Sequence, residues 1–167
     1  EGGARNYSLI EHLTAHDIPV IGHLGLTPQS KEAFGGFKIQ AKTEADIEKI
    51  GEESLGLQEA GAVALVLEGI PAEVAKELTD LLKIPTIGIG AGKECNGQVL
   101  VWQDMMGMTE ESTPTFVRKW GDMRKHLREG VTAYCRAVKE ANFPDETESF
   151  SLPDSIDQQQ LRSLLPD

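Results

Sequence analysis

The sequence predicts an α/β fold built on a parallel sheet, of the type found in (β/α)8 TIM barrels. Four short apolar runs alternate with segments of helical periodicity, as they do in proteins built from βαβ units. Each run is apolar at successive positions rather than at every second one. Continuous apolarity is typical of strands that are covered on both faces, as in parallel sheets.

The chain length limits how much of a barrel can form. The chain has 167 residues, whereas a complete barrel takes about 250 residues and is rarely shorter than about 200. Four predicted strands are half of the eight that a closed barrel needs. We therefore expect about four βα units rather than a complete barrel.

The four strands are predicted at 18–22, 62–67, 84–89 and 99–102. Pro19 and Pro85 mark the starts of the first and third strands, because the first position of a strand needs no N–H donor. These two strands also share an Ile-Pro-x-Ile-Gly pattern, which indicates repeated βα units.

Helices are predicted between and after the strands. A short one covers 7–15, and a longer one follows the N-cap residue Thr43 and ends at Gly61. A third begins near Pro71 and carries one apolar stripe. The pair Thr113-Pro114 predicts the start of a long amphipathic helix that continues to Asn142.

The chain divides by composition into residues 1–144, predicted to form the barrel portion, and residues 145–167. The second segment has six acidic residues and one basic residue, Arg162, and lacks a periodic apolar face. We expect an acidic C-terminal tail that is mobile or docked on a partner.

The overall charge excludes some classes of partner. Lys and Arg total 16 against 27 Asp and Glu, a formal net charge of −11, which argues against binding to nucleic acid or to anionic lipid. No apolar run approaches the roughly 20 residues of a membrane span. The two cysteines form no CxxC pair and favour a reducing compartment, so we expect a cytoplasmic protein. Small anionic substrates remain compatible with this charge.

Candidate catalytic residues follow the predicted strands, because working residues in parallel α/β folds lie at the carboxyl ends of strands. Glu68 ends the second strand, where partial burial would raise its pKa and make it a proton acceptor; the alternative is an ion-paired or capping carboxylate. His23 follows the first strand and could bind a substrate oxygen or a metal, or be structural. Glu1-Gly2-Gly3 has the form of another turn at a strand end.

Two further motifs are interpreted as structural. The segment Gly88–Lys93 is rich in glycine but matches neither phosphate-binding template, so we expect it to allow close backbone packing. Cys135 is predicted on the core face of the long helix and Cys95 in an exposed turn.

Several motifs together resemble the ketopantoate hydroxymethyltransferase family, in order from residue 1 to about residue 144. The most specific is the twelve-residue segment Pro19–Ser30. The others are Glu1–Gly3, Gly35–Gln40, Leu65–Glu68, Ile84–Gly92 and Gly97–Val101 with Asp104.

The resemblance implies a (β/α)8 barrel of which this chain supplies roughly the second half, followed by a C-terminal helix and tail. It implies transfer of a hydroxymethyl group from 5,10-methylenetetrahydrofolate to 3-methyl-2-oxobutanoate, giving 2-dehydropantoate in pantothenate biosynthesis. The expected cofactor is Mg²⁺ or a similar divalent metal. Glu68 matches the proton acceptor, Glu1 a carboxylate of the metal site and His23 a substrate contact; the residues that bind folate stay unassigned.

The family's first barrel half, with two metal-binding aspartates, has no counterpart in this chain. We therefore expect the chain to be one piece of a longer protein, inactive alone, within a homo-oligomer (the family forms decamers). Two alternatives remain. One is another Mg-dependent C–C bond enzyme of the phosphoenolpyruvate mutase or isocitrate lyase type, although their catalytic Cys motif is not found. The other is an inactive half-barrel that serves as an assembly module through its long helix.

Overall fold

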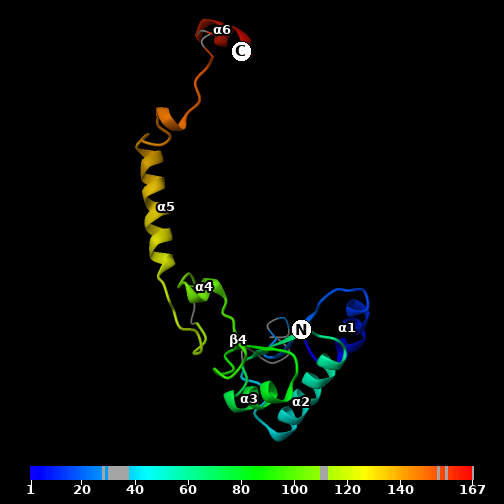
Figure 1. Ribbon diagram of the computed structural model, residues 1–167. Coiled ribbons are helices and arrows are strands. Elements are labelled where there is room, and N and C mark those ends of the chain that lie inside the picture. The colour runs from blue at the N-terminus through cyan, green and yellow to red at the C-terminus, as the bar shows by residue number, and fades with distance from the viewer. Residues whose placement is uncertain (28, 30–37, 110–112, 154, 157, 167) are drawn as a thin grey trace. The chain divides into compact units, whose positions relative to one another are not determined.

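The computed structural model describes residues 1–167 except 28, 30–37, 110–112, 154, 157 and 167 (Figure 1). The chain divides into two compact units, Glu1–Trp120 and Gly121–Asp167, which are described separately. Within the Pro19–Ser30 and Gly35–Gln40 motifs, Pro28, Ser30 and the segment 35–37 lie outside the described residues.

The first unit is built on a four-stranded parallel sheet, which confirms the predicted α/β class. Its strands are β1 (Ile21–Gly25), β2 (Ala64–Glu68), β3 (Thr86–Ile89) and β4 (Gly97–Gln98). They pair in sequence order, each parallel to the next. This sequential parallel arrangement is consistent with a protein of the barrel family.

Two predicted strands lie elsewhere than expected. The first begins at Ile21 rather than at residue 18, and it extends through His23 to Gly25. The fourth was predicted at 99–102 but occupies Gly97–Gln98, and Trp102 instead begins the short helix α4 (Trp102–Met105). Val99 and Val101 are both exposed, so this apolar run is not a strand covered on both faces.

The three longest helices of the first unit follow the predicted pattern closely. They are α1 (Tyr7–Thr14), α2 (Glu44–Glu59) and α3 (Ala72–Leu81), and the 3-10 helix η1 (Ala4–Asn6), which was not predicted, precedes α1. The Thr43 hydroxyl accepts the Asp46 N–H at 3.2 Å, which confirms Thr43 as the N-cap of α2. The left-handed backbone of Gly61 (φ +99°) follows the end of α2, a conformation that glycine adopts without strain.

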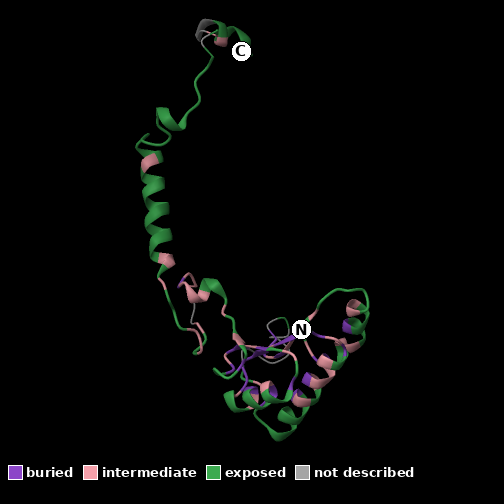
Figure 2. Ribbon diagram, in the orientation of Figure 1, coloured by how far each residue is buried: buried purple, intermediate pink, exposed green. Residues whose placement is uncertain are grey.

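The core lies between one face of the sheet and these helices. Figure 2 shows buried backbone in the strands and in the helices beside them. Leu24 of β1 and Leu67 of β2 belong to the same buried cluster as Leu57 of α2 and Leu78 of α3. Because strand side chains alternate, His23 and Glu68 lie on the opposite face of the sheet. The helices therefore cover one face, and the predicted site residues occupy the other.

The two cysteines are placed opposite to expectation. Cys95 is buried within the core cluster, whereas Cys135 is exposed. Cys95 lies beside Gly88 of β3, where a Cβ atom on the glycine would be 3.0 Å from its sulfur. A turn adjoining a buried strand is thus covered, although its sequence is polar.

The second unit contains the long helix α5 (Met123–Lys139), followed by the 3-10 helix η3 (Glu146–Glu148) and α6 (Gln158–Leu164). The predicted helix start at Thr113 was wrong, because α5 begins ten residues later, after Asp122, whose side chain accepts the Lys125 N–H at 3.3 Å. No residue of α5 is buried. None of the helices in the described part of the chain is both long enough and apolar enough to cross a membrane.

Candidate active site

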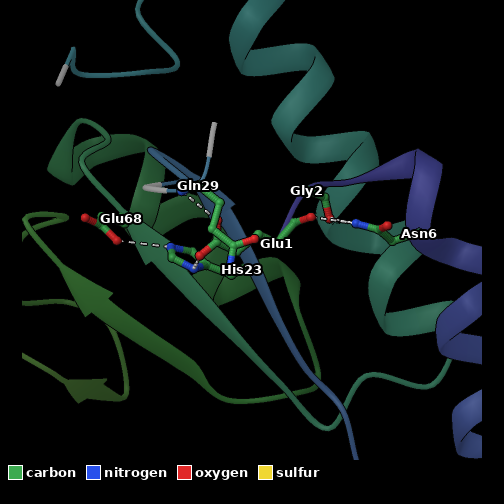
Figure 3. A network of polar contacts seen from close by, with 6 residues as sticks. All are labelled: Glu1, Gly2, Asn6, His23, Gln29 and Glu68. Carbon is green, nitrogen blue, oxygen red and sulfur yellow. Dashed lines mark hydrogen bonds and ion pairs between the residues drawn. The ribbon is translucent and has the colours of Figure 1, made fainter. Parts of the chain in front are cut away.

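The site is built on the neighbouring strands β1 and β2, on the face that the helices leave open. His23 is the central residue of β1, and Glu68 is the last residue of β2. The register pairs His23 with Val66 and Gly25 with Glu68. His23 and Glu68 are thus on the same face of the sheet, because Glu68 lies two residues beyond Val66, the partner of His23. Their side chains point toward each other (Figure 3).

The His23 imidazole and the Glu68 carboxylate are in direct contact. His23 Nε2 lies 3.1 Å from Glu68 Oε2, and the two side chains are only 18% and 12% exposed. Despite the short distance, the contact lacks hydrogen-bond geometry, and Nε2 is buried with no hydrogen-bond partner among the described residues. A buried polar nitrogen without a hydrogen-bond partner is costly, and here the Glu68 carboxylate is the charged group that lies beside it.

Glu1 lies on the other side of the imidazole. Its Oε1 is 3.8 Å from His23 Nδ1, and its Oε2 accepts the Gln29 backbone N–H at 3.2 Å. The three residues predicted for the site are therefore brought together, with a carboxylate near each ring nitrogen of His23 (Figure 3).

The turn that carries Glu1 is fixed to β1. The Gly2 N–H donates to the His23 carbonyl oxygen at 3.1 Å, and Gly2 has a left-handed backbone, with φ +98°. Gly3 is buried against α2, where a Cβ atom would lie 2.1 Å from the Glu53 carboxyl carbon. Both positions therefore favour glycine: Gly2 because of its left-handed conformation, and Gly3 because a side chain would collide with Glu53.

The sequence assigned no role to two contributors to this site. Gln29 lies within the Pro19–Ser30 motif and follows the first predicted strand, and these two positions were its available signals. Asn6 showed no signal, yet its side-chain Nδ2 donates to the carbonyl oxygens of Glu1 and Gly2 at 2.6 and 3.3 Å. A hydrogen bond from a side chain to the backbone of a turn leaves no periodicity by which it could be found.

The glycine-rich segment after β3 packs closely, as predicted. A Cβ atom on Gly90 would lie 2.5 Å from Phe116, and one on Gly92 would lie 2.4 Å from the Cβ atom of Ala72. Both glycines have positive φ. The segment therefore serves the packing of the chain around the end of β3.

The donor atoms of the site suit a hard cation only in part. The carboxylate of Glu1 is the type of ligand that Mg²⁺ prefers, and Mg²⁺ is often held by only one or two protein carboxylates. In the part of the chain that the structure describes, no group of three or more His, Cys, Asp or Glu side chains could hold a metal ion. Any metal bound here would thus draw fewer than three of its ligands from these His, Cys, Asp and Glu side chains.

The arrangement of Glu68 and His23 suits proton transfer from a substrate that is held by a hydrogen bond. The Glu68 carboxylate, largely shielded from water, can accept a proton from a carbon acid placed against it. The neighbouring His23 Nε2 can bond to a substrate oxygen.

The chain was compared with known proteins. The profile of the ketopantoate hydroxymethyltransferase family matches residues 1–146. A 3-methyl-2-oxobutanoate hydroxymethyltransferase of Clostridium kluyveri is 49% identical over 156 residues, covering 93% of this chain and 56% of that protein. Proteins of the same name from Syntrophus aciditrophicus and Clostridium beijerinckii are 49% and 44% identical over 150 and 164 residues.

The chain spans 55–58% of the length of these three relatives. The matched region contains every residue of the site described above. The chain therefore belongs to the ketopantoate hydroxymethyltransferase family.

Proposed function

We propose that the protein catalyses hydroxymethyl transfer to 3-methyl-2-oxobutanoate. In this reaction 5,10-methylenetetrahydrofolate, the oxo acid and water give 2-dehydropantoate and tetrahydrofolate. The observation that carries the proposal is the contact of 3.1 Å between His23 Nε2 and Glu68 Oε2 on the open face of the sheet. The name of the relatives states the acceptor and the transferred group, and it supports the same substrate.

Glu68 acts as the general base in this proposal. Its carboxylate accepts the proton from C3 of the oxo acid, and the electron pair of the broken C–H bond forms the enolate. The enolate carbon then bonds to the methylene carbon of the folate, whose two C–N bonds break. Water supplies the hydroxyl oxygen of the product, and the two folate nitrogens take up one proton from water and the one that Glu68 accepted. Support comes from the low exposure of Glu68 and from its place at the carboxyl end of β2, the usual location of catalytic groups in parallel α/β folds.

His23 contacts the substrate in this proposal. Its Nε2 is buried and has no hydrogen-bond partner among the described residues, while Glu68 Oε2 lies 3.1 Å away, so a substrate oxygen would bond to Nε2 in place of this ion-pair contact. The imidazole would orient the oxo acid so that C3 faces Glu68. A positioned contact of this kind contributes by fixing the geometry of the reacting atoms.

Glu1 would hold a divalent cation, Mg²⁺ in the proposal, because it provides the hard carboxylate oxygens on the side of His23 away from Glu68. When bound, such a cation polarises the carbonyl of a 2-oxo acid and acidifies the adjacent C–H bond. Gln29 assists by donating its N–H to Glu1 Oε2, which fixes the direction of the carboxylate.

We further propose that activity needs residues equivalent to those that the relatives carry beyond this chain. The relatives are longer, and the described residues contain no group of three or more His, Cys, Asp or Glu side chains that could hold a metal ion. Those additional residues would complete both the metal site and the (β/α)8 barrel. The chain alone is then expected to bind substrate weakly and to turn it over little.

Deuterium exchange tests this proposal before any folate is needed. 3-Methyl-2-oxobutanoate is incubated in D₂O with Mg²⁺ and the chain, with and without the remaining segment of the Clostridium kluyveri relative, and NMR follows the C3 proton. We expect exchange with the combined protein, and a loss of about 10²–10⁴-fold in Glu68→Gln.

Glu73→Gln is the matched control, because Glu73 is an exposed carboxylate in the first turn of α3. It should leave the exchange rate unchanged. A Glu68→Gln protein that exchanges C3 as fast as the control would refute the assignment of Glu68 as the base.

A further inference from the structure

We propose that Asn6 is a positioning residue that holds the carboxylate of Glu1 beside His23. The inference rests on the proposed function, in which Glu1 is a working carboxylate. Asn6 itself touches none of the groups proposed to meet the substrate. Its described contacts are all with the Glu1–Gly3 turn (Figure 3).

The geometry of Asn6 is specific for an amide. Nδ2 lies 2.6 Å from the Glu1 carbonyl oxygen and 3.3 Å from the Gly2 carbonyl oxygen, so one NH₂ group bridges two consecutive acceptors. The Asn6 backbone N–H also donates to the Gly3 carbonyl oxygen at 2.9 Å, which fixes the base of the side chain. An asparagine amide provides two donors, whereas an aspartate of the same shape provides none when it is ionised.

Helix capping does not explain this side chain. Asn6 is the N-cap residue of α1, where asparagine commonly accepts a hydrogen bond from the first turn. Here its side chain makes no such bond and is directed back to the turn instead. Its removal therefore takes no side-chain cap from α1.

The turn is held from two sides. On one side, the Gly2 N–H donates to the carbonyl oxygen of His23 in β1. On the other side, Asn6 binds the two carbonyl groups that flank Gly2. Gly2 has a left-handed backbone, and a glycine that is not held in place also adopts other conformations. Without the Asn6 hydrogen bonds, the turn should therefore change conformation more often and let Glu1 move away from His23 and Gln29.

The test uses NMR on the full chain, without metal or substrate. The Gln29 amide reports on Glu1, because it donates to Glu1 Oε2, and the Leu65 amide reports on global stability, because it donates to the Pro85 carbonyl oxygen inside the sheet. We expect Asn6→Ala to accelerate hydrogen exchange at Gln29 by about fivefold, equivalent to losing roughly one net hydrogen bond. Exchange at Leu65 should stay unchanged.

Asn6→Asp separates the hydrogen bonds from the shape of the side chain. It keeps the size and the N-cap preference but loses both donors, so it should accelerate exchange at Gln29 as Asn6→Ala does. Asn142→Ala is the matched control, because Asn142 is an exposed asparagine of the second unit that donates to Glu140. It should leave Gln29 unchanged.

A double variant tests whether Asn6 acts through Glu1. In the Glu1→Ala background, Asn6→Ala should add little to the exchange rate of Gln29, because the side-chain acceptor of the Gln29 N–H is already gone. Wild-type exchange at Gln29 in Asn6→Asp, or equal acceleration at Gln29 and Leu65, would overturn the inference. Neither result depends on catalysis, so the deuterium-exchange test of Glu68 can fail or succeed separately.

Discussion

Gly25 passes so close to Glu68 that a Cβ atom placed on it would lie 2.2 Å from the Glu68 carbonyl oxygen. The two residues are direct partners in the parallel register of β1 and β2. Leu26 continues the contact, since its N–H donates to the same oxygen at 2.8 Å. The backbone of Glu68 is thus held from the β1 side at the end of both strands.

Gly25→Ala is expected to destabilise the fold by about 2–4 kcal/mol. The new methyl group meets backbone rather than a movable side chain, and Gly25 has a φ of +90°, which strains any other residue. Urea unfolding followed by far-ultraviolet circular dichroism measures the change.

Gly97→Ala in β4 is the matched control for Gly25. Its Cβ atom would meet only Ile87 at 3.9 Å, and its φ is not positive, so we expect a change within about 1 kcal/mol. Equal free energies of unfolding for the two variants would contradict the close approach of β1 to Glu68.

His23→Phe is expected to raise the KM for 3-methyl-2-oxobutanoate about tenfold in the deuterium-exchange assay. The change keeps a ring but removes the nitrogen that is proposed to bond to the substrate, and a hydrogen bond of this type is worth about 1–1.5 kcal/mol. His126→Phe, at an exposed position of α5, is the control. An unchanged KM in His23→Phe would remove His23 from the substrate site.

Two glycines of α2 should respond to alanine in opposite ways. A Cβ atom on Gly51 would meet nothing within 4 Å, so Gly51→Ala should stabilise the helix by about 0.5–1 kcal/mol. A Cβ atom on Gly56 would lie 2.3 Å from the Tyr7 hydroxyl, so Gly56→Ala should destabilise by about 1–3 kcal/mol. Thermal unfolding of the two variants gives the sign directly, and a shared sign would show that Tyr7 does not pack on α2 in this way.

Stability at alkaline pH should depend on Tyr7. Burial raises the pKa of Tyr7, and the nearby carboxylates of Glu53, Glu52 and Glu59 raise it further. Because the pKa is higher in the folded state, the protonated Tyr7 side chain contributes fully to the free energy of unfolding below the unfolded pKa of about 10. This contribution is lost as the pH rises through the folded pKa.

Tyr7→Phe should remove that part of the pH dependence. The difference in free energy of unfolding between wild type and Tyr7→Phe should therefore shrink between pH 9 and 11, as measured by urea unfolding at each pH. A difference that is constant over this interval would contradict the burial of the phenol against α2. Measurements at pH 7 supply the reference for the lost hydrogen bond from Tyr7 to the Glu53 carbonyl oxygen.

Sequence patterns predicted the parallel sheet and the helices of the first unit because these elements are defined by burial. The second and third strands were placed within two residues at each end, since their apolar runs coincide with the largely buried strands of the sheet. The apolar run 99–102 was misleading, because Val99 and Val101 are exposed and only Gly97 and Gln98 pair with β3. Apolarity marks a strand only where other elements cover it.

The candidate site divides in a similar way. Glu68 could be predicted because it ends an apolar run, His23 because it follows one, and Glu1 because it lies within a motif shared with a family. The structure brings the three side chains together, although His23 lies at the centre of β1. Asn6 could not be predicted, since its role consists of two hydrogen bonds to the backbone of a turn. The start of α5 was also missed, because Asp122 caps the helix and Thr113 does not.

The pairing of Leu24 with Leu67 has a consequence beyond burial. A slip of one residue between β1 and β2 would turn the leucine of the displaced strand out of the core, and would carry His23 or Glu68 into it. A misaligned pairing therefore costs free energy in two ways: one leucine is lost from the core, and one ionisable side chain is buried in it. Packing in the hydrophobic core thus fixes the register that places His23 and Glu68 beside each other on the opposite face.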